Sequence, residues 1–180
     1  MAQNAKKVFL GLLLCSVAAP AARAQDIGLG PITIRGSAGA AFVAGGERFR
    51  RRAGVGPALG GAVLVNPFPA VGLFFAYDRP QAGRWLESES MTMGLRFSGA
   101  LRSGLIPFLE AGAGVGRTDT SRSLNHFAAK AGIGLEMVIV PQVSLGMLLD
   151  YHLIEVRGSL ARSLHELVPA AFAAYHFGSK

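Results

Sequence analysis

The chain has 180 residues and a net charge of +7, with 18 Lys and Arg against 11 Asp and Glu. Three of the basic residues, Lys6, Lys7 and Arg23, and the single cysteine, Cys15, fall within the first 24 residues. Without that segment the charge falls to +4 and no cysteine remains. This weakens a nucleic-acid-binding interpretation and excludes a disulfide or a thiolate metal site. The remaining length suits one domain.

The N-terminus has the three parts of a secretory signal peptide, namely a basic start, a short apolar run and a small–x–small ending. The apolar run covers residues 8–19, and Ala22 and Ala24 provide the ending. A transmembrane helix is the alternative, but it needs roughly 20 apolar residues, and Pro20 interrupts this run. We therefore expect a leader over residues 1–24 that is cleaved before Gln25.

Beyond the leader, large apolar residues recur at every second position. Over residues 91–98, Met91, Met93, Leu95 and Phe97 alternate with Thr92, Gly94, Arg96 and Ser98. A period of two places the two sets on opposite faces of a β-strand, whereas a helix needs spacings of three and four. The same alternation recurs over residues 71–78, 109–116, 129–138 and 143–152, and more weakly over 32–43, 55–65 and 168–177. The count is about eight segments of roughly ten residues, the length of a tilted membrane strand.

The connections between these segments differ in length. Three are short and turn-like, at residues 66–69, 102–106 and 140–142. Four are longer and more polar, at residues 45–54, 79–90, 118–126 and 157–166. Short turns at one end and long loops at the other are typical of an outer-membrane barrel, with its periplasmic turns and extracellular loops.

The second face of the strands is rich in Gly, Ala and Ser, with isolated charges near mid-strand. A soluble β-sandwich or lipocalin-like barrel, the main alternative, would usually carry Lys, Glu, Thr and Ser on its water-facing side. A crowded small lumen explains the pattern better, because small residues make room and charged ones can pair across it. The expected lumen charge network is Arg96, Glu110, Lys130, Glu136 and Asp150. The outward face carries Tyr77, Tyr151, Tyr175 and Phe177, candidates for the aromatic girdles at the membrane interfaces.

The sequence thus predicts an all-β fold over residues 25–180: an eight-stranded antiparallel up-and-down transmembrane β-barrel. Several segments resemble the small OmpA-like outer-membrane β-barrel domains. Residues 107–116 resemble the fifth strand of that family, and residues 129–151 resemble the hairpin that follows it. Tyr175 and Phe177 resemble its C-terminal insertion signature, although three further residues follow where the family usually ends on the aromatic.

The resemblance implies a cellular location and a set of partners. The location is the cell outer membrane. The partners are outer-membrane lipid and lipopolysaccharide, and the barrel-insertion machinery during biogenesis. Nucleic acid is not among the expected partners, and a monomer is expected.

No catalytic, cofactor or metal constellation emerges from the sequence. His126 lies where a lipid A deacylase would keep its base, but the position of that family's serine nucleophile, two residues on, is Ala128. Asp119, Asp150 and His152 lack metal-ligand spacing. We therefore expect no cofactor.

The sharpest charge cluster in the chain consists of Arg48, Arg50, Arg51 and Arg52. It is either a solvated loop or a contact for lipopolysaccharide phosphates, whose geometry suits arginine. The function expected is that of a non-enzymatic barrel in a structural or surface-interaction role, with a lumen plugged by side chains and loops facing the medium. A narrow porin-like channel is the alternative, and a lipid A-modifying enzyme is a distant one.

Overall fold

A computed structural model describes residues 30–45, 54–68, 70–82, 86–99, 104–118, 126–156 and 159–178. The expected leader with its cleavage site lies outside the described residues, and so do Arg48, Arg50, Arg51 and Arg52. The described residues contain no helix that is long and apolar enough to cross a bilayer.

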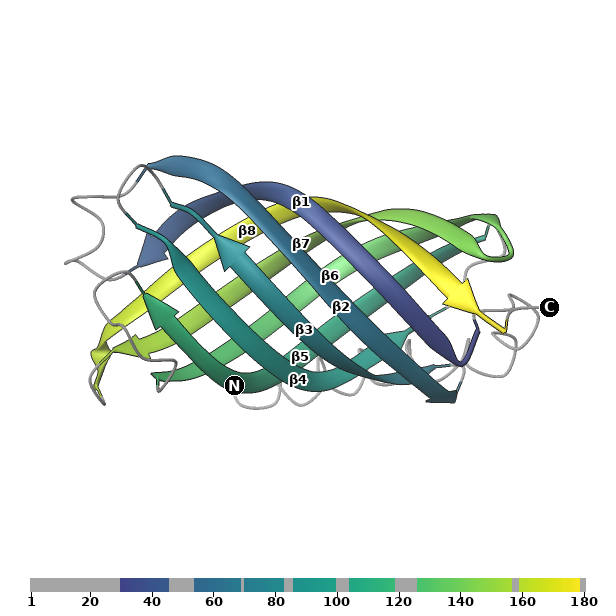
Figure 1. The fold of residues 1–180 in the computed structure, drawn as a ribbon, viewed down its shortest axis with the longest axis horizontal. Coiled ribbons are helices and arrows are strands. Elements are labelled where there is room, and N and C mark those ends of the chain that lie inside the picture. The colour runs from purple at the N-terminus through teal and green to yellow at the C-terminus, as the bar shows by residue number, and fades with distance from the viewer. Residues whose placement is uncertain are drawn as a thin grey trace, which may run out of the picture.

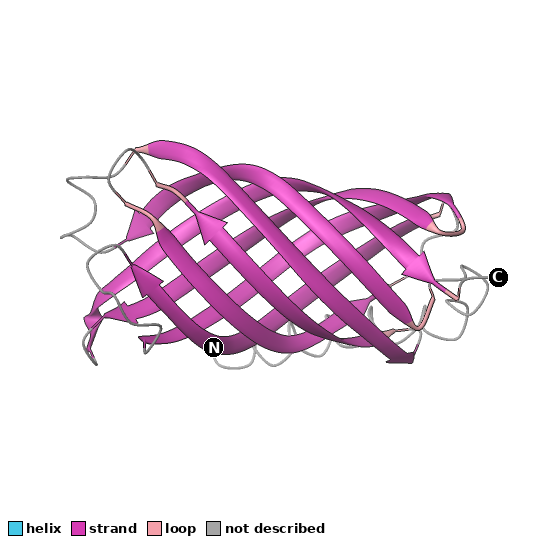
Figure 2. Cartoon of the chain, viewed as in Figure 1, coloured by secondary structure: helices cyan, strands magenta, loops and turns pink. Residues whose placement is uncertain are grey.

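Eight strands account for almost all of the described chain (Figures 1 and 2). They are β1 Ile32–Gly45, β2 Val55–Phe68, β3 Val71–Pro80, β4 Ser88–Ser98, β5 Leu105–Thr118, β6 His126–Val140, β7 Val143–Val156 and β8 Ser159–Phe177. Each strand pairs antiparallel with the next along the chain, and β8 pairs with β1, so the sheet closes into an up-and-down barrel. The strands run obliquely to the long axis of the barrel (Figure 1). The predicted fold class is confirmed.

The two faces of the barrel wall are inverted relative to a soluble protein. The side chain of Leu95 is 42% exposed on the outside, whereas the adjacent Arg96 is 3% exposed in the lumen. Met93 and Met147 are 69% and 67% exposed. A soluble β-sandwich would bury its large apolar residues and expose its charges. This wall therefore matches a hydrocarbon environment outside and a polar, packed interior.

Inside the lumen, apolar clusters and small residues fill the space that the charges leave. Phe108 and Phe172 meet edge to face, with ring centroids 5.8 Å apart. Gly134 and Gly146 lie against these rings, since a Cβ at either position would come within 2.3 Å of a ring carbon. Small residues in the wall thus make room for the aromatic side chains, as expected for a barrel of this size.

Two of the expected loops are shorter than predicted from the sequence. Residues 157–166 were expected to form a loop, but β8 begins at Ser159. The alternation fades there because an outward position, His165, is polar while the inward position beside it, Leu164, is large and apolar. The loop expected over residues 79–90 is also shorter, because the bridge between Gln81 and Glu87 continues the β3–β4 ladder. A pattern that relies on outward apolar residues underestimates strand length where the outward positions become polar.

Candidate functional site

The first set of lumen charges, here called the arginine cluster, consists of Arg35, Arg96, Glu110 and Glu136. The guanidinium of Arg35 on β1 donates to both carboxylate oxygens of Glu110 on β5, at 2.5 and 2.9 Å. Strands β1 and β5 lie opposite each other in a ring of eight, so this pair crosses the lumen. Both side chains are almost fully buried, at 3% and 1% exposed. A bidentate, charge-assisted contact of this kind has a strict geometry.

Arg96 joins the two glutamates of this cluster. It faces Glu110 directly across the β4–β5 pair, with a guanidinium-to-carboxylate distance of 3.7 Å. It also forms an ion pair with Glu136 and donates to Ser98 at 3.0 Å. The guanidinium carbon lies 3.9 Å from the centroid of the Phe108 ring. The four charges therefore form one connected set, as buried charges must if they are not to be left without a partner.

A polar chain continues from Glu136 toward the end of the barrel with the short turns. Ser144 hydrogen-bonds to Glu136 and lies 2.9 Å from Nε2 of His176. The other imidazole nitrogen, Nδ1, lies 2.8 Å from Oγ1 of Thr33. The amide of Asn66 donates to that same hydroxyl at 3.3 Å. The lumen is thus hydrogen-bonded from the arginine cluster to the turn that joins β2 and β3.

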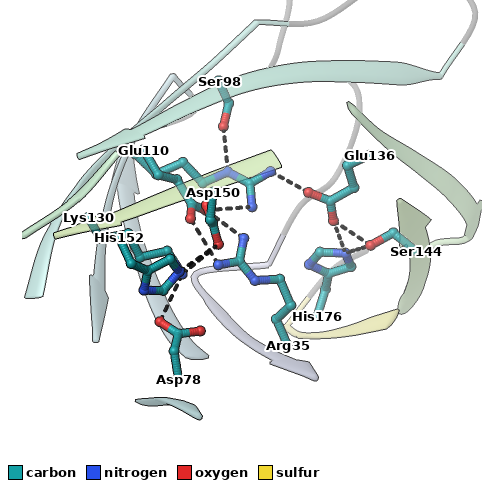
Figure 3. A network of polar contacts seen from close by, with 11 residues as sticks. Arg35, Asp78, Ser98, Glu110, Lys130, Glu136, Ser144, Asp150, His152 and His176 are labelled. Carbon is teal, nitrogen blue, oxygen red and sulfur yellow. Dashed lines mark hydrogen bonds and ion pairs between the residues drawn. The ribbon is translucent and has the colours of Figure 1, made fainter. Parts of the chain in front are cut away.

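The second set, here called the lysine cluster, consists of Asp78, Lys130, Asp150 and His152 (Figure 3). The ammonium of Lys130 on β6 lies 3.0 Å from Asp78 of β3 and 2.8 Å from Asp150 of β7. Nε2 of His152 lies 3.9 Å from Asp150. All four residues are 2–8% exposed. They stand nearer the long-loop end than the arginine cluster, because β3 and β7 run toward that end and β6 starts there.

The five charges expected in the lumen from the sequence all lie there, and each belongs to one of the two clusters. Sequence reasoning missed Arg35 and Asp78, which complete the clusters. Both occupy the inward parity of their strands, so the alternation could have found them. Arg35 lies in one of the weakly patterned segments, and Asp78 stands next to an expected loop, where an aspartate is ordinary.

The outward face carries aromatic residues near both ends of the barrel. Tyr175 and Phe177 lie near the short-turn end, 47% and 45% exposed, with ring centroids 4.8 Å apart. Tyr77 and Tyr151 lie nearer the long-loop end, 38% and 39% exposed. Tyr175 pairs across the β7–β8 ladder with Val143 at the start of β7, and this brackets an apolar belt between Val143 and Tyr151. Such paired aromatic bands mark the two membrane interfaces of a barrel.

Beyond this belt, at the long-loop end, the outer surface carries charges. Glu89 on β4 accepts from Arg117 on β5 at 2.7 Å, and Arg79 forms an ion pair with Glu87. Arg117 and Arg79 are 41% and 50% exposed. These contacts differ in kind from the lumen pairs, because solvent screens them.

Neither His126 nor His176 has the arrangement that acyl-transfer chemistry needs. His126 has a buried Nε2 without a hydrogen-bond partner in the described residues, and Ala128 stands where a nucleophile would be needed. Ser144, His176 and Glu136 do come together, but Ser144 and Glu136 both approach the same Nε2. An acid that orients a catalytic histidine binds the other nitrogen. Because Ser144 is 0% exposed, we interpret Ser144, His176 and Glu136 as a structural hydrogen-bond network.

A closed sheet with an apolar exterior, aromatic bands and a charged interior defines a transmembrane β-barrel. Comparison with solved structures gives the same class. Neisserial surface protein A matches with a TM-score of 0.65 at 14% identity, over 83% of this chain and 99% of that one. The N-terminal β-barrel domain of OprF from Pseudomonas aeruginosa matches with a TM-score of 0.59 at 14% identity, over 83% and 99%. OprG from the same organism matches with a TM-score of 0.50 at 12% identity, over 83% and 96%.

No protein-family model and no curated protein sequence matches the chain. At these identities the likeness to solved structures concerns the fold. The chain has the fold of small eight-stranded outer-membrane barrels, as its resemblance to the OmpA-like domains predicted.

Proposed function

We propose that the mature protein is a non-enzymatic integral outer-membrane barrel whose lumen is plugged by side chains and which acts through its long-loop end. The observation that carries the proposal is the ion pair between Arg35 and Glu110, which joins opposite walls of the lumen. An eight-stranded barrel encloses little more than its own side chains. A charged bridge across that space leaves the exposed loops as the part that meets other molecules.

Outer-membrane location is part of this proposal. It is supported by the apolar exterior, by the likeness to Neisserial surface protein A and the OprF barrel, and by the leader expected over residues 1–24. In this location the long-loop end faces the medium and lipopolysaccharide. Arg48 and Arg50–Arg52 supply guanidinium groups suited to its phosphates.

The test separates the plugged barrel from the narrow channel. Protein folded into planar bilayers should show little or no single-channel conductance. Glu110→Ala should raise it, because the change removes one side of the bridge and opens space beside Arg35. Glu89→Ala on the outer surface is the matched control and should leave conductance unchanged. A wild-type barrel that conducts strongly, with Glu110→Ala making no difference, would favour the channel.

A further inference from the structure

A row of charged side chains crosses the outer wall of the barrel near the long-loop end, on β3, β4 and β5. Glu89 on β4 is the register partner of Arg117 on β5, and Nε of Arg79 on β3 lies 3.8 Å from it on the other side. The adjacent residues Asp78 and Gly116 are buried in the lumen, so the three charges point outward. Neighbouring strands lie about 4.8 Å apart, so the backbones of the two arginines are about 10 Å apart.

The row lies directly beyond the aromatic band that marks the long-loop interface of the membrane. On β3, Arg79 is the next outward residue after Tyr77, and on β5, Arg117 is the next after Val115. Tyr77 and Val115 both pair with Met91 of β4. Tyrosines of such bands lie at the level of the lipid headgroups, and charges on the lipid face are tolerated only near that level. The charged row therefore lies at headgroup depth.

The neighbouring strands remain apolar beyond this row. Leu59 on β2 is the register partner of Arg79, and Val55, four residues nearer the loops, is still 63% exposed. Phe42 on β1, the partner of Val55, is 39% exposed as well. The charged row is thus a local sector beside a wall that stays apolar toward the same end. Because that wall requires lipid, the sector beside it faces lipid headgroups.

The two arginines of the row keep hydrogen-bond donors for a ligand. Arg79 uses Nε for Glu87 and Glu89, and Arg117 uses Nη2 for Glu89. Within the described part of the chain, neither guanidinium makes another hydrogen bond or ion pair. Two nitrogens of each group remain, Nη1 and Nη2 of Arg79 and Nε and Nη1 of Arg117, and both side chains are at least two-fifths exposed. Paired N–H groups of this kind match the oxygens of a phosphate.

A ligand that fits this row has two separated anionic groups and an apolar part. Glu87 and Glu89 balance the two guanidinium groups, so the row has no net charge and holds anions through short, directed hydrogen bonds. Lipid A, the membrane anchor of lipopolysaccharide, has this chemistry, because it carries a phosphate at each end of a disaccharide and acyl chains below. An ordinary phospholipid has a single phosphate and supplies an anion to only one arginine.

We propose that Arg79 and Arg117 bind the two phosphates of a lipid A molecule, whose acyl chains pack on the wall formed by Tyr77, Met91 and Val115. The proposal rests on the outer-membrane location proposed above, since lipopolysaccharide lies at the long-loop end only there. It adds a site on the barrel wall that is separate from the loop arginines at residues 48–52. Glu89, between the two arginines, keeps Arg117 turned toward the row.

The experiment measures lipid binding by the mature barrel in detergent with EDTA, so that no divalent cation bridges lipid and carboxylates. Native mass spectrometry follows the bound fraction during titration with diphosphoryl lipid A, with lipid A stripped of both phosphates, or with phosphatidylglycerol. We expect wild-type protein to bind diphosphoryl lipid A about tenfold or more tightly than either other lipid, the factor that one charge-assisted hydrogen bond supplies. The urea midpoint should rise with diphosphoryl lipid A, because a ligand of the folded state stabilises it.

Three variants locate the site. Arg79→Gln with Arg117→Gln should weaken binding of diphosphoryl lipid A by about tenfold or more and leave binding of the stripped lipid unchanged. Arg102→Gln with Lys180→Gln is the matched control, which removes two positive charges from the connection between β4 and β5 and from the C-terminus and should bind as wild type. Arg48→Gln, Arg50→Gln, Arg51→Gln and Arg52→Gln together should still bind one diphosphoryl lipid A. The migration of unboiled protein reports whether each variant has folded.

Three results would overturn the proposal. Equal binding of diphosphoryl and stripped lipid A means that the wall recognises acyl chains alone. Equal binding of phosphatidylglycerol means that any phosphate-bearing lipid suffices. Unchanged binding by Arg79→Gln with Arg117→Gln, together with a loss in the loop variant, places the phosphates on the loop and leaves the proposed surface function standing. Because binding is measured in detergent, a barrel located outside the outer membrane would be revealed by fractionation and not by this assay.

Discussion

Replacing Glu110 by alanine removes the central acceptor of the arginine cluster. Glu110 receives two hydrogen bonds from Arg35 and lies 3.7 Å from Arg96. After the change, Arg96 keeps its ion pair with Glu136. Arg35 keeps none, because Glu110 is its only ion-pair partner among the described residues. The substitution therefore leaves one buried cation without its partner.

The expected loss of stability follows from that single unpaired cation. Breaking a buried pair by removing one member costs about 3–5 kcal/mol. Arg35 also lies near the rings of Phe108 and Phe172, 5.9 and 5.4 Å from their centroids, and these contacts remain. The carboxylates of Asp78 and Asp150 still attract the guanidinium at longer range. We therefore expect the lower end of that range, about 3 kcal/mol.

The assay is urea unfolding of the barrel in detergent, with the folded fraction read from the migration of unboiled protein. A double variant, Arg35→Met with Glu110→Leu, should recover most of the loss, because apolar side chains of similar volume leave no unpaired charge. Glu89→Ala breaks the solvent-exposed contact with Arg117 and should unfold with the wild type. The reasoning fails if Glu110→Ala unfolds at the wild-type urea concentration, or if the double variant is less stable than Glu110→Ala alone.

Other predictions test the lipid-facing side of the barrel, the packing of the lumen and the cellular location. Met147→Arg, midway along the apolar belt of β7, should lower the free energy of unfolding by about 2–4 kcal/mol, and Leu145→Arg, nearer the interface, should lower it less. Equal urea midpoints for the two variants would refute the assigned depth. Gly146→Ala should lower the free energy of unfolding by about 1–3 kcal/mol, because its Cβ would lie 2.3 Å from a Phe172 ring carbon and from a backbone oxygen. The control is Gly36→Ala, whose Cβ meets nothing within 4 Å and which should leave the urea midpoint unchanged. N-terminal sequencing of protein extracted from the outer membrane should begin at Gln25, and recovery of a soluble form or of an uncleaved start would contradict the leader. Boiled and unboiled protein should migrate differently in detergent gels, since a closed sheet has no edge from which to unravel.

Much of the fold could be predicted because the strand period is a local property. The alternation around Leu95 and Arg96 places one side chain in lipid and the next in the lumen whatever the rest of the chain does. The same argument placed Glu110 and Lys130 on the inward face. It failed at residues 157–166, where a polar outward residue, His165, and a large apolar inward residue, Leu164, break the alternation in the first part of β8.

The sequence by itself determined the number of strands, their order and the face on which each side chain lies. The tertiary structure decided which lumen charges meet. Arg35 and Glu110 stand 75 residues apart on opposite strands, and Asp78 reaches Lys130 across 52 residues. Such contacts depend on how far the strands are staggered when the sheet closes, because the stagger sets the height of every inward side chain. A two-residue period indicates which face of the sheet a side chain lies on, but not its height along the barrel axis. The partners across the lumen are therefore fixed only when the barrel closes.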